Sequence, residues 1–338
     1  MPHDVRAASH RGTARRRALS VTLALELMLV VLGGALVWQS DAGDERPRVT
    51  NLVDMNLAPA APAAPAVPGA ATGTYTWDCG RNKNGHRNTA NIVMAPGSPG
   101  QPHHVHDYVG NVSTAVGSTP QTLAGARTTC RNGDLSTYFW PVLRTLDPAT
   151  TGDHTDHTDH TGHDGHDGQI QVPVEVRLTF SGNPRGNVVP MPPLLAGTVG
   201  DAVAVTNGGR NVAATWTCSG TTDGRTTAYP RCPAGEQVQR VYDFPSCWDG
   251  RRADSKSHRA HLAFPSPDGS CPRSTFPVPR LRLTLGYDLP PAAAFQIDAF
   301  DGQRNSPLTD HAFFVNLMPQ PLMATVVDCL NSGRTCRD

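Results

Sequence analysis

Histidine and aspartate side chains are concentrated in three short segments of this 338-residue chain. In chain order they are His104 and His106, then Asp249 with His258 and His261, then Asp310 and His311. Imidazole titrates near neutral pH, so these side chains can donate or accept a proton at an ester or glycosidic bond. We therefore predict that the histidines form one catalytic site with Asp249 beside them.

The spacing within the two histidine pairs also suits metal binding. Alternation along an extended segment puts His104 and His106 on one face, and a helical turn would bring His258 and His261 together. Two such pairs could supply four ligands to a divalent metal ion, or three ligands and an open position. The alternative is that some of these histidines lie on the surface and others make hydrogen bonds within the scaffold.

Another histidine-rich stretch, residues 153–168, has a different character. Its histidines recur every third residue next to aspartates, a period that matches neither a strand nor an α-helix. They are His154, His157, His160, His163 and His166. We expect a solvated loop inserted into the domain. It either collects zinc, nickel or copper weakly or is a repeat expansion without a function.

Three aromatic residues, Tyr138, Trp140 and Trp248, could stack on sugar rings, although the first two also fit a core or a cleft wall. The chain contains no Gly-x-Ser-x-Gly or His-Glu-x-x-His motif, and we assign no carboxylate pair of the glycosidase kind. Two functions therefore stay open. The domain is an enzyme acting on cell-wall polysaccharide, or it binds such glycans without catalysis.

Eight cysteines predict an oxidising compartment, because their number is even and none forms a Cys-x-x-Cys pair. Pairing neighbours along the sequence gives four disulfides. They are Cys79–Cys130, Cys218–Cys232, Cys247–Cys271 and Cys329–Cys336.

The first seventy or so residues are expected to precede the folded domain. Arginines in residues 1–17 predict a cytoplasmic N-terminus, and the apolar residues 18–38 are long enough to cross a membrane once as a signal anchor. The alternative is a signal peptide that is removed, which would leave a secreted protein. Residues 39–72 are rich in alanine and proline and predict an extended linker to an extracellular domain, residues 73–338.

Alternating apolar residues and frequent turn residues predict an all-β or β-dominated α+β fold, a loop-rich sandwich-like single domain held by disulfides. Expected strands include residues 92–97, 172–180, 201–206, 212–218 and 280–285, with one helix within 317–330. The formal net charge of zero gives no indication of a nucleic-acid partner. The partners we expect are the membrane and cell-wall glycan.

Several of these segments resemble the DUF1996 family. The similar blocks are His104-Val105-His106 after Pro96-Gly97, residues 135–141 (LSTYFWP), 231–235 (RCPAG), 244–250 (FPSCWDG), 254–264 (DSKSHRAHLAF) and 270–272 (SCP). The resemblance implies a secreted domain of the kind found in fungi and actinobacteria, often beside carbohydrate-binding modules. It implies no particular reaction.

Carried over by position, the family's His-x-His falls on His104 and His106, and its two later histidines fall on His258 and His261. The similarity weakens near Asp310-His311, where Ala312 and Phe313 stand in place of the family's glycine and aspartate. If that aspartate takes part in chemistry, this member is altered.

Overall fold

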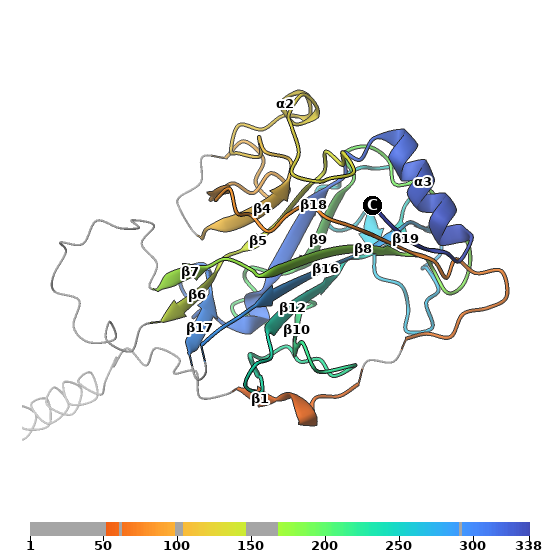
Figure 1. Ribbon diagram of the computed structural model, residues 1–338. Coiled ribbons are helices and arrows are strands. Elements are labelled where there is room, and N and C mark those ends of the chain that lie inside the picture. The colour runs from red at the N-terminus through yellow and green to blue at the C-terminus, as the bar shows by residue number, and fades with distance from the viewer. Residues whose placement is uncertain (1–51, 61–62, 99–103, 147–167, 291–292) are drawn as a thin grey trace, which may run out of the picture. The chain divides into compact units, whose positions relative to one another are not determined.

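The computed structural model describes residues 52–60, 63–98, 104–146, 168–290 and 293–338 (Figure 1). The chain divides into two units, Met1–Arg48 and Val49–Asp338, and only the second falls within these ranges. The predicted membrane span and the five histidines of the insertion lie outside the described residues. Within those ranges, no helix has the length and apolar character that a membrane span requires.

The fold is mostly β, as the sequence predicts, and its largest sheet has six strands. In spatial order they are β10 (Thr215–Cys218), β12 (Val238–Asp243), β16 (Arg280–Tyr287), β8 (Glu175–Ser181), β2 (Thr74–Trp77) and β19 (Thr335–Arg337). Neighbouring strands are antiparallel except β2 and β19, which are parallel.

A second sheet has five antiparallel strands and carries two of the candidate histidines. Its strands in order are β3 (Arg87–Asn88), β4 (His106–Gly110), β5 (Thr137–Pro141), β18 (His311–Val315) and β9 (Ala196–Gly200). The sheet brings together segments that lie about 200 residues apart in the sequence, since β4 and β18 are both neighbours of β5.

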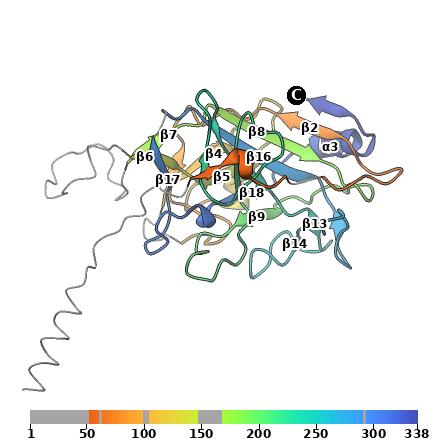
Figure 2. The same ribbon diagram turned by 90° about the horizontal axis from the view of Figure 1, so that it is seen from below.

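Smaller elements complete the domain. The short strands are β17 (Ala294–Ile297), β6 (Leu143–Leu146) and β7 (Gln169–Gln171) in one sheet, β14 (Leu262–Ala263), β13 (Cys247–Trp248) and β15 (Phe276–Pro277) in another, and the parallel pair β1 (Val53–Asp54) and β11 (Pro230–Arg231). The helices are α2 (Pro120–Ala124), α3 (Gln320–Asn331) and two 3-10 turns, Met55–Leu57 and Pro307–Thr309. Figure 2 shows β13 and β14 on the opposite side of the domain from β6 and β7.

The main core lies between the two large sheets. Leu281, Leu283 and Leu285 alternate inward along β16, as predicted, and are almost completely buried. Trp77 of β2 contacts Tyr138 of β5 edge-on, with ring centroids 6.2 Å apart. Side chains from both sheets thus form one apolar cluster, the arrangement of a sandwich.

Local predictions had mixed outcomes. The strands expected within 172–180, 212–218 and 280–285 are confirmed, as is the C-terminal helix. The strands expected at 92–97 and 201–206 are wrong, because both segments form turns. The side-chain oxygens of Asn91 and Asp201 accept backbone N–H groups two residues further on, which closes a turn in place of a strand.

The end of the predicted linker packs against the domain. The Val53 N–H donates to the Tyr229 carbonyl over 3.0 Å, and the Val67 N–H donates to the Pro184 carbonyl over 2.9 Å. Met55 and Ala71 are buried. From residue 52 onward, therefore, the described part of this alanine- and proline-rich segment covers the domain surface and does not extend away from it.

All four predicted disulfides are confirmed: Cys79–Cys130, Cys218–Cys232, Cys247–Cys271 and Cys329–Cys336. Their sequence separations range from 7 to 51 residues. A longer closed loop restricts the unfolded chain more, so these bonds should differ in their effect on stability.

We predict that replacing Cys79 and Cys130 with alanine lowers the free energy of unfolding by about 4 kcal/mol, and replacing Cys329 and Cys336 lowers it by about 2 kcal/mol. Urea denaturation of the two double variants measures the difference. Equal losses would contradict loop closure as the main source of stabilisation.

Candidate metal centre

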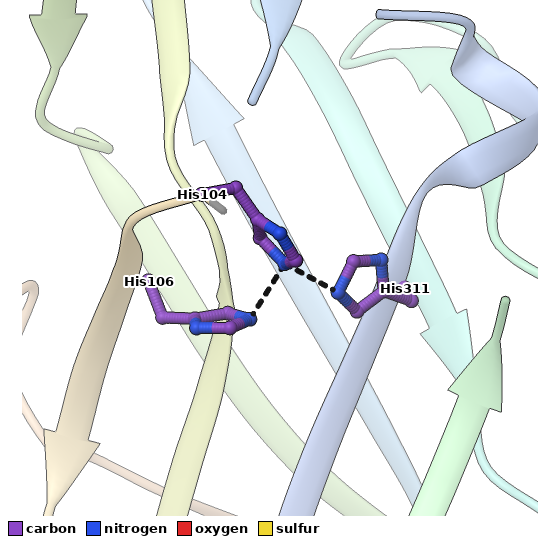
Figure 3. Close-up of side chains that lie close together, drawn as sticks. All are labelled: His104, His106 and His311. Atoms are coloured by element: carbon purple, nitrogen blue, oxygen red, sulfur yellow. Dashed lines mark hydrogen bonds between the residues drawn. The ribbon is translucent and has the colours of Figure 1, made fainter. Parts of the chain in front are cut away.

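Three buried histidines, His104, His106 and His311, converge at one end of the five-stranded sheet (Figure 3). The Nε2 atom of His104 lies 3.1 Å from that of His106 and 3.2 Å from that of His311. Each ring offers one nitrogen to a common point, and these ligand atoms all lie within 4.8 Å of one another. The cluster could therefore hold a metal ion.

Strand register explains why His106 and His311 meet. His106 of β4 pairs with Pro141 of β5, and continuing the pairing of Phe139 with Phe313 places His311 beside Pro141 on its other side. Proline has a short, compact side chain. The two imidazoles can therefore lean toward each other above it, although they stand two strands apart.

The next row of the sheet consists of aromatic rings. Tyr108, Phe139 and Phe313 stack side by side, with successive ring centroids 5.1 and 4.9 Å apart. Phe139 and Phe313 also contact the histidine rings edge-on. These rings pack on the face opposite the main core and close one side of the histidine cluster.

His104 lies just before β4 and is held by its neighbours. The backbone N–H of Val105 donates to the carboxylate of Asp298 over 3.1 Å, and the Val105 carbonyl accepts the N–H of Val142 over 2.9 Å. The ring of Phe300 contacts His104 at 4.6 Å between centroids. The extended backbone thus points His104 and His106 to one face, as their spacing predicts.

Burial favours the unprotonated form of His106 and His311. The Nδ1–H of His311 donates to the Thr309 carbonyl over 2.7 Å, which leaves its Nε2 lone pair facing the cluster. Burial lowers the pKa of His311 to about 4. Burial, together with the charges of His311 and Arg240, also holds the pKa of His106 well below its usual value.

The distances between nitrogens suit a bound ion. In a tetrahedral zinc site with Zn–N bonds of about 2.0–2.1 Å, neighbouring ligand nitrogens lie about 3.3–3.4 Å apart. The 3.1 and 3.2 Å observed here are close to that spacing. A neutral imidazole has one N–H group, and that of His311 already points to Thr309. The Nε2 of His104 can donate one hydrogen bond, either to His106 or to His311, so hydrogen bonding among the rings does not account for both short contacts.

A fully buried ion pair lies beside the cluster. The guanidinium of Arg240 on β12 makes two bonds to Asp310, of 2.6 and 3.1 Å, and donates a third to the Pro141 carbonyl over 2.7 Å. The hydroxyl of Tyr242 also donates to Asp310 over 2.8 Å. Arg240 therefore links Asp310, which precedes His311, to β5, the strand between His106 and His311.

His258 and His261 are not part of this cluster. The Nδ1 of His261 accepts from the Ser255 hydroxyl over 3.0 Å, and its Nε2–H donates to the Ala196 carbonyl over 2.7 Å. The Nδ1 of His258 lies 2.8 Å from Asp254. The segment forms turns and no helix, with a φ of 53° at His258, so the expected shared face does not arise. The third histidine beside His104 and His106 is thus His311, whereas from the sequence we expected His258 and His261 to complete a metal site there.

Asp249 also has a local role in the structure. Its carboxylate accepts the backbone N–H groups of Arg251 and Arg252, and the Arg252 side chain bonds to it over 2.7 Å. These bonds hold the pKa of Asp249 at about 2 against the opposing effect of partial burial. The arrangement closes the turn after β13.

The proposed sugar-stacking role of Tyr138 and Trp140 needs correction. Their side chains are 1% and 0% exposed, because both point from β5 into the core between the sheets. A glycan cannot reach their faces. Trp248 is half-buried, and its indole N–H donates to the Arg252 carbonyl over 2.7 Å. It is the one member of the predicted trio that is not fully buried.

Sequence reasoning missed Arg240, Asp298 and Pro141, which position the cluster. A signal for Arg240 did exist. It alternates with Val238 and Tyr242 along β12, so it had to face the core with them. Arginine is almost never fully buried unless it is paired, and that position therefore implied a buried acid.

We predict that Arg240→Ala lowers the free energy of unfolding by about 3–5 kcal/mol, because it leaves the carboxylate of Asp310 buried without its partner. Arg177→Ala is the matched control. It breaks an exposed pair with Glu175 and should cost less than about 1 kcal/mol. Urea denaturation compares them, and similar losses would argue against a structural role for the buried pair.

Gly200, which pairs with His311, offers a second test. It has a φ of +78°, and a Cβ there would overlap the Asp310 carbonyl oxygen. Gly208 has a φ of +79° with open space around it. We predict that Gly208→Ala costs about 1 kcal/mol from backbone strain, and that Gly200→Ala costs about 1–3 kcal/mol more from overlap. Thermal unfolding of the two variants gives the comparison, and equal costs would contradict the tight contact.

Comparison with curated proteins found no match, and comparison with solved structures found none either. A protein-family model described as "Domain of unknown function (DUF1996)" matches residues 92–311. This range covers more than half of the chain and includes His104, His106 and His311. The chain therefore belongs to the DUF1996 family.

Proposed function

We propose that this domain is an extracytoplasmic metalloenzyme in which His104, His106 and His311 hold a divalent transition metal ion, with zinc as the first candidate. We propose further that it hydrolyses cell-wall or environmental polysaccharide. The observation that carries the proposal is the convergence of three buried imidazole nitrogens. Three protein ligands leave a fourth position open, as in catalytic zinc sites.

The chemistry of the ligand set supports a catalytic ion. All eight cysteines are in disulfides, so no thiolate is available to close the coordination shell. Neutral imidazoles leave the positive charge of the ion uncompensated. Such an ion polarises a bound water or a substrate oxygen. Asp310 neutralises the nearby Arg240, so this pair adds no net charge beside the ion.

The four disulfides favour an oxidising compartment outside the cytoplasm. A single-pass anchor at residues 18–38 remains our proposal for how the domain is held there, and secretion after signal cleavage is the alternative. Either arrangement exposes the domain to wall glycans. The polysaccharide substrate is inferred from this location and from the association of related domains with carbohydrate-binding modules.

A specific observation favours a second candidate function, glycan binding without turnover. Trp248 of β13 pairs with Phe276 of β15, and the Phe276 side chain is 51% exposed. The two side chains lie on the same face of this short sheet, where they could contact the apolar face of a sugar ring. This surface belongs to different strands from the histidine cluster, so substitutions can test the two candidates separately.

We predict that the purified protein, freed of metal with a chelator, takes up one tightly bound zinc ion per chain. His106→Ala and His311→Ala should each weaken zinc binding at least about 100-fold, because two remaining nitrogens cannot hold the ion well. His258→Ala is the control and should leave the affinity unchanged. Competition with a chromophoric chelator measures each affinity.

These measurements use a background in which the five histidines of residues 153–168 are replaced by asparagine, so that the insertion contributes no sites. Unchanged zinc affinity in His106→Ala and His311→Ala would refute the centre. Zinc uptake lost on replacing the five histidines alone would instead assign metal binding to the insertion.

Turnover separates the two functional candidates. The enzyme hypothesis expects zinc-dependent release of reducing ends from a panel of wall polysaccharides, abolished in His311→Ala and retained in Trp248→Ala with a raised KM. Binding without product release, lost in Trp248→Ala and unaffected by His311→Ala, would favour the binding module.

A further inference from the structure

A second candidate site lies apart from the histidine cluster, in an open cleft of about 900 Å³. Three segments form its walls: residues 78–84, residues 127–131 and the start of β8. The volume lies at the upper end of the range of about 300–1,000 Å³ that is typical of small-molecule sites. Nothing in the proposed metal chemistry uses this cleft.

The charged side chains along the cleft are mainly positive. They are Arg81, Lys83, Arg127 and Arg131 against Asp78 and Glu175. Four positive and two negative groups leave an excess of two positive charges, whereas the whole chain has a formal net charge of zero. The cleft is therefore suited to an anionic ligand.

Four of these six groups are already engaged. Arg131 pairs with Asp78 over 3.2 Å, Arg81 donates to the Val174 carbonyl, and Glu175 pairs with Arg177. Lys83 and Arg127 are exposed, and neither makes an ion pair or a side-chain hydrogen bond within the described ranges. Arg81 keeps its positive charge, because its partner is a neutral carbonyl. Lys83 and Arg127, which come from different walls, are thus the two cations of the cleft without a side-chain partner in the described part of the chain.

The loop that presents Lys83 is fixed by a buried amide. Asn82 is 2% exposed and has a φ of 56°. Its side chain accepts the His86 N–H over 2.8 Å and donates to the His86 carbonyl and to the Asp107 carboxylate. These bonds hold the loop backbone in one conformation, which fixes the point from which the Lys83 side chain extends.

The opposite wall is fixed in a similar way. The Arg127 carbonyl accepts the Val112 N–H over 3.1 Å, and the hydroxyl of Thr129 donates to the Cys79 carbonyl over 2.6 Å. The Cys79–Cys130 disulfide connects the two walls covalently. Because the backbone of both walls is fixed, anion binding orders only the two side chains and not the loops.

We propose that this cleft binds an anionic glycan, a chain that carries single negative charges at intervals as carboxylate or phosphodiester groups. Lys83 and Arg127 contact successive charges from the two sides. Asp78 already pairs with Arg131, and its N–H donates to the Asp338 carboxylate over 3.0 Å. The ligand charges therefore bind between Lys83 and Arg127, which have no such partner among the described residues. Among the described residues no aromatic side chain lines the cleft, which disfavours the base stacking that binds single-stranded nucleic acid.

The test is binding of defined glycans to the full chain. The probes are oligogalacturonate, which carries carboxylates, phosphomannan, which carries phosphodiesters, and neutral mannan. Lys83→Gln and Arg127→Gln should each weaken binding of the preferred anionic probe about threefold to fivefold, since a single exposed charge pair contributes modestly. Raising the salt concentration should weaken binding further.

Lys256→Gln is the matched control, because Lys83 and Lys256 are the two lysines of the chain and both are exposed. The bound glycan should also protect Lys83, and not Lys256, from acetylation. His311→Ala should leave this binding unchanged, so the result is independent of the metal centre. Equal binding of neutral mannan, or binding unaffected by both Lys83→Gln and Arg127→Gln, would overturn the proposal. So would preference for a DNA oligomer over both anionic glycans.

Discussion

The buried pair of Arg240 and Asp310 joins the two large sheets at the candidate site. Both side chains are completely removed from solvent, and burying two charges costs several kcal/mol per ion unless their bonds are nearly complete. Here they are nearly complete, because Tyr242 and the Pro141 carbonyl supply the remaining partners. Arg240 belongs to the six-stranded sheet and its partners include β5 of the other sheet. The pair thus fixes how the sheets meet where the histidines stand.

The histidine cluster follows from that arrangement. One guanidinium holds both Pro141 of β5 and Asp310, so His106 and His311 flank Pro141 at a fixed separation. The row of aromatic rings beneath the two histidines prevents either imidazole from turning away. Burial is the main cause of the lowered pKa of both imidazoles, and the guanidinium lowers it further. The buried cation therefore fixes the geometry of the cluster, while burial keeps His106 and His311 unprotonated, as metal binding requires.

Local sequence patterns could predict part of this site. The alternation of His104 and His106, the inward leucines of β16 and the pairing of neighbouring cysteines are short-range features, and all three hold in the structure. The place of His311 depends on the register between β5 and β18, about 170 residues apart, which no local pattern encodes. The helical turn assumed for His258 and His261 failed for another reason. Side-chain bonds from Asp254 and Ser255 stabilise a sequence of turns there.

The segment that contains those two histidines nevertheless supports the site through the edge of its sheet. β9 is the outermost strand next to β18, and an edge strand exposes unpaired backbone groups. Residues 253–261 cover this edge along its length: the Ala253 carbonyl and His261 bond to Ala196, the His258 carbonyl accepts from Thr198, and Arg259 donates to the Gly200 carbonyl. Gly200 in turn pairs with His311. Residues 254–264, whose two histidines resembled metal ligands in the sequence, therefore have a structural role. They hold β9 in place, and His311 is aligned against β9.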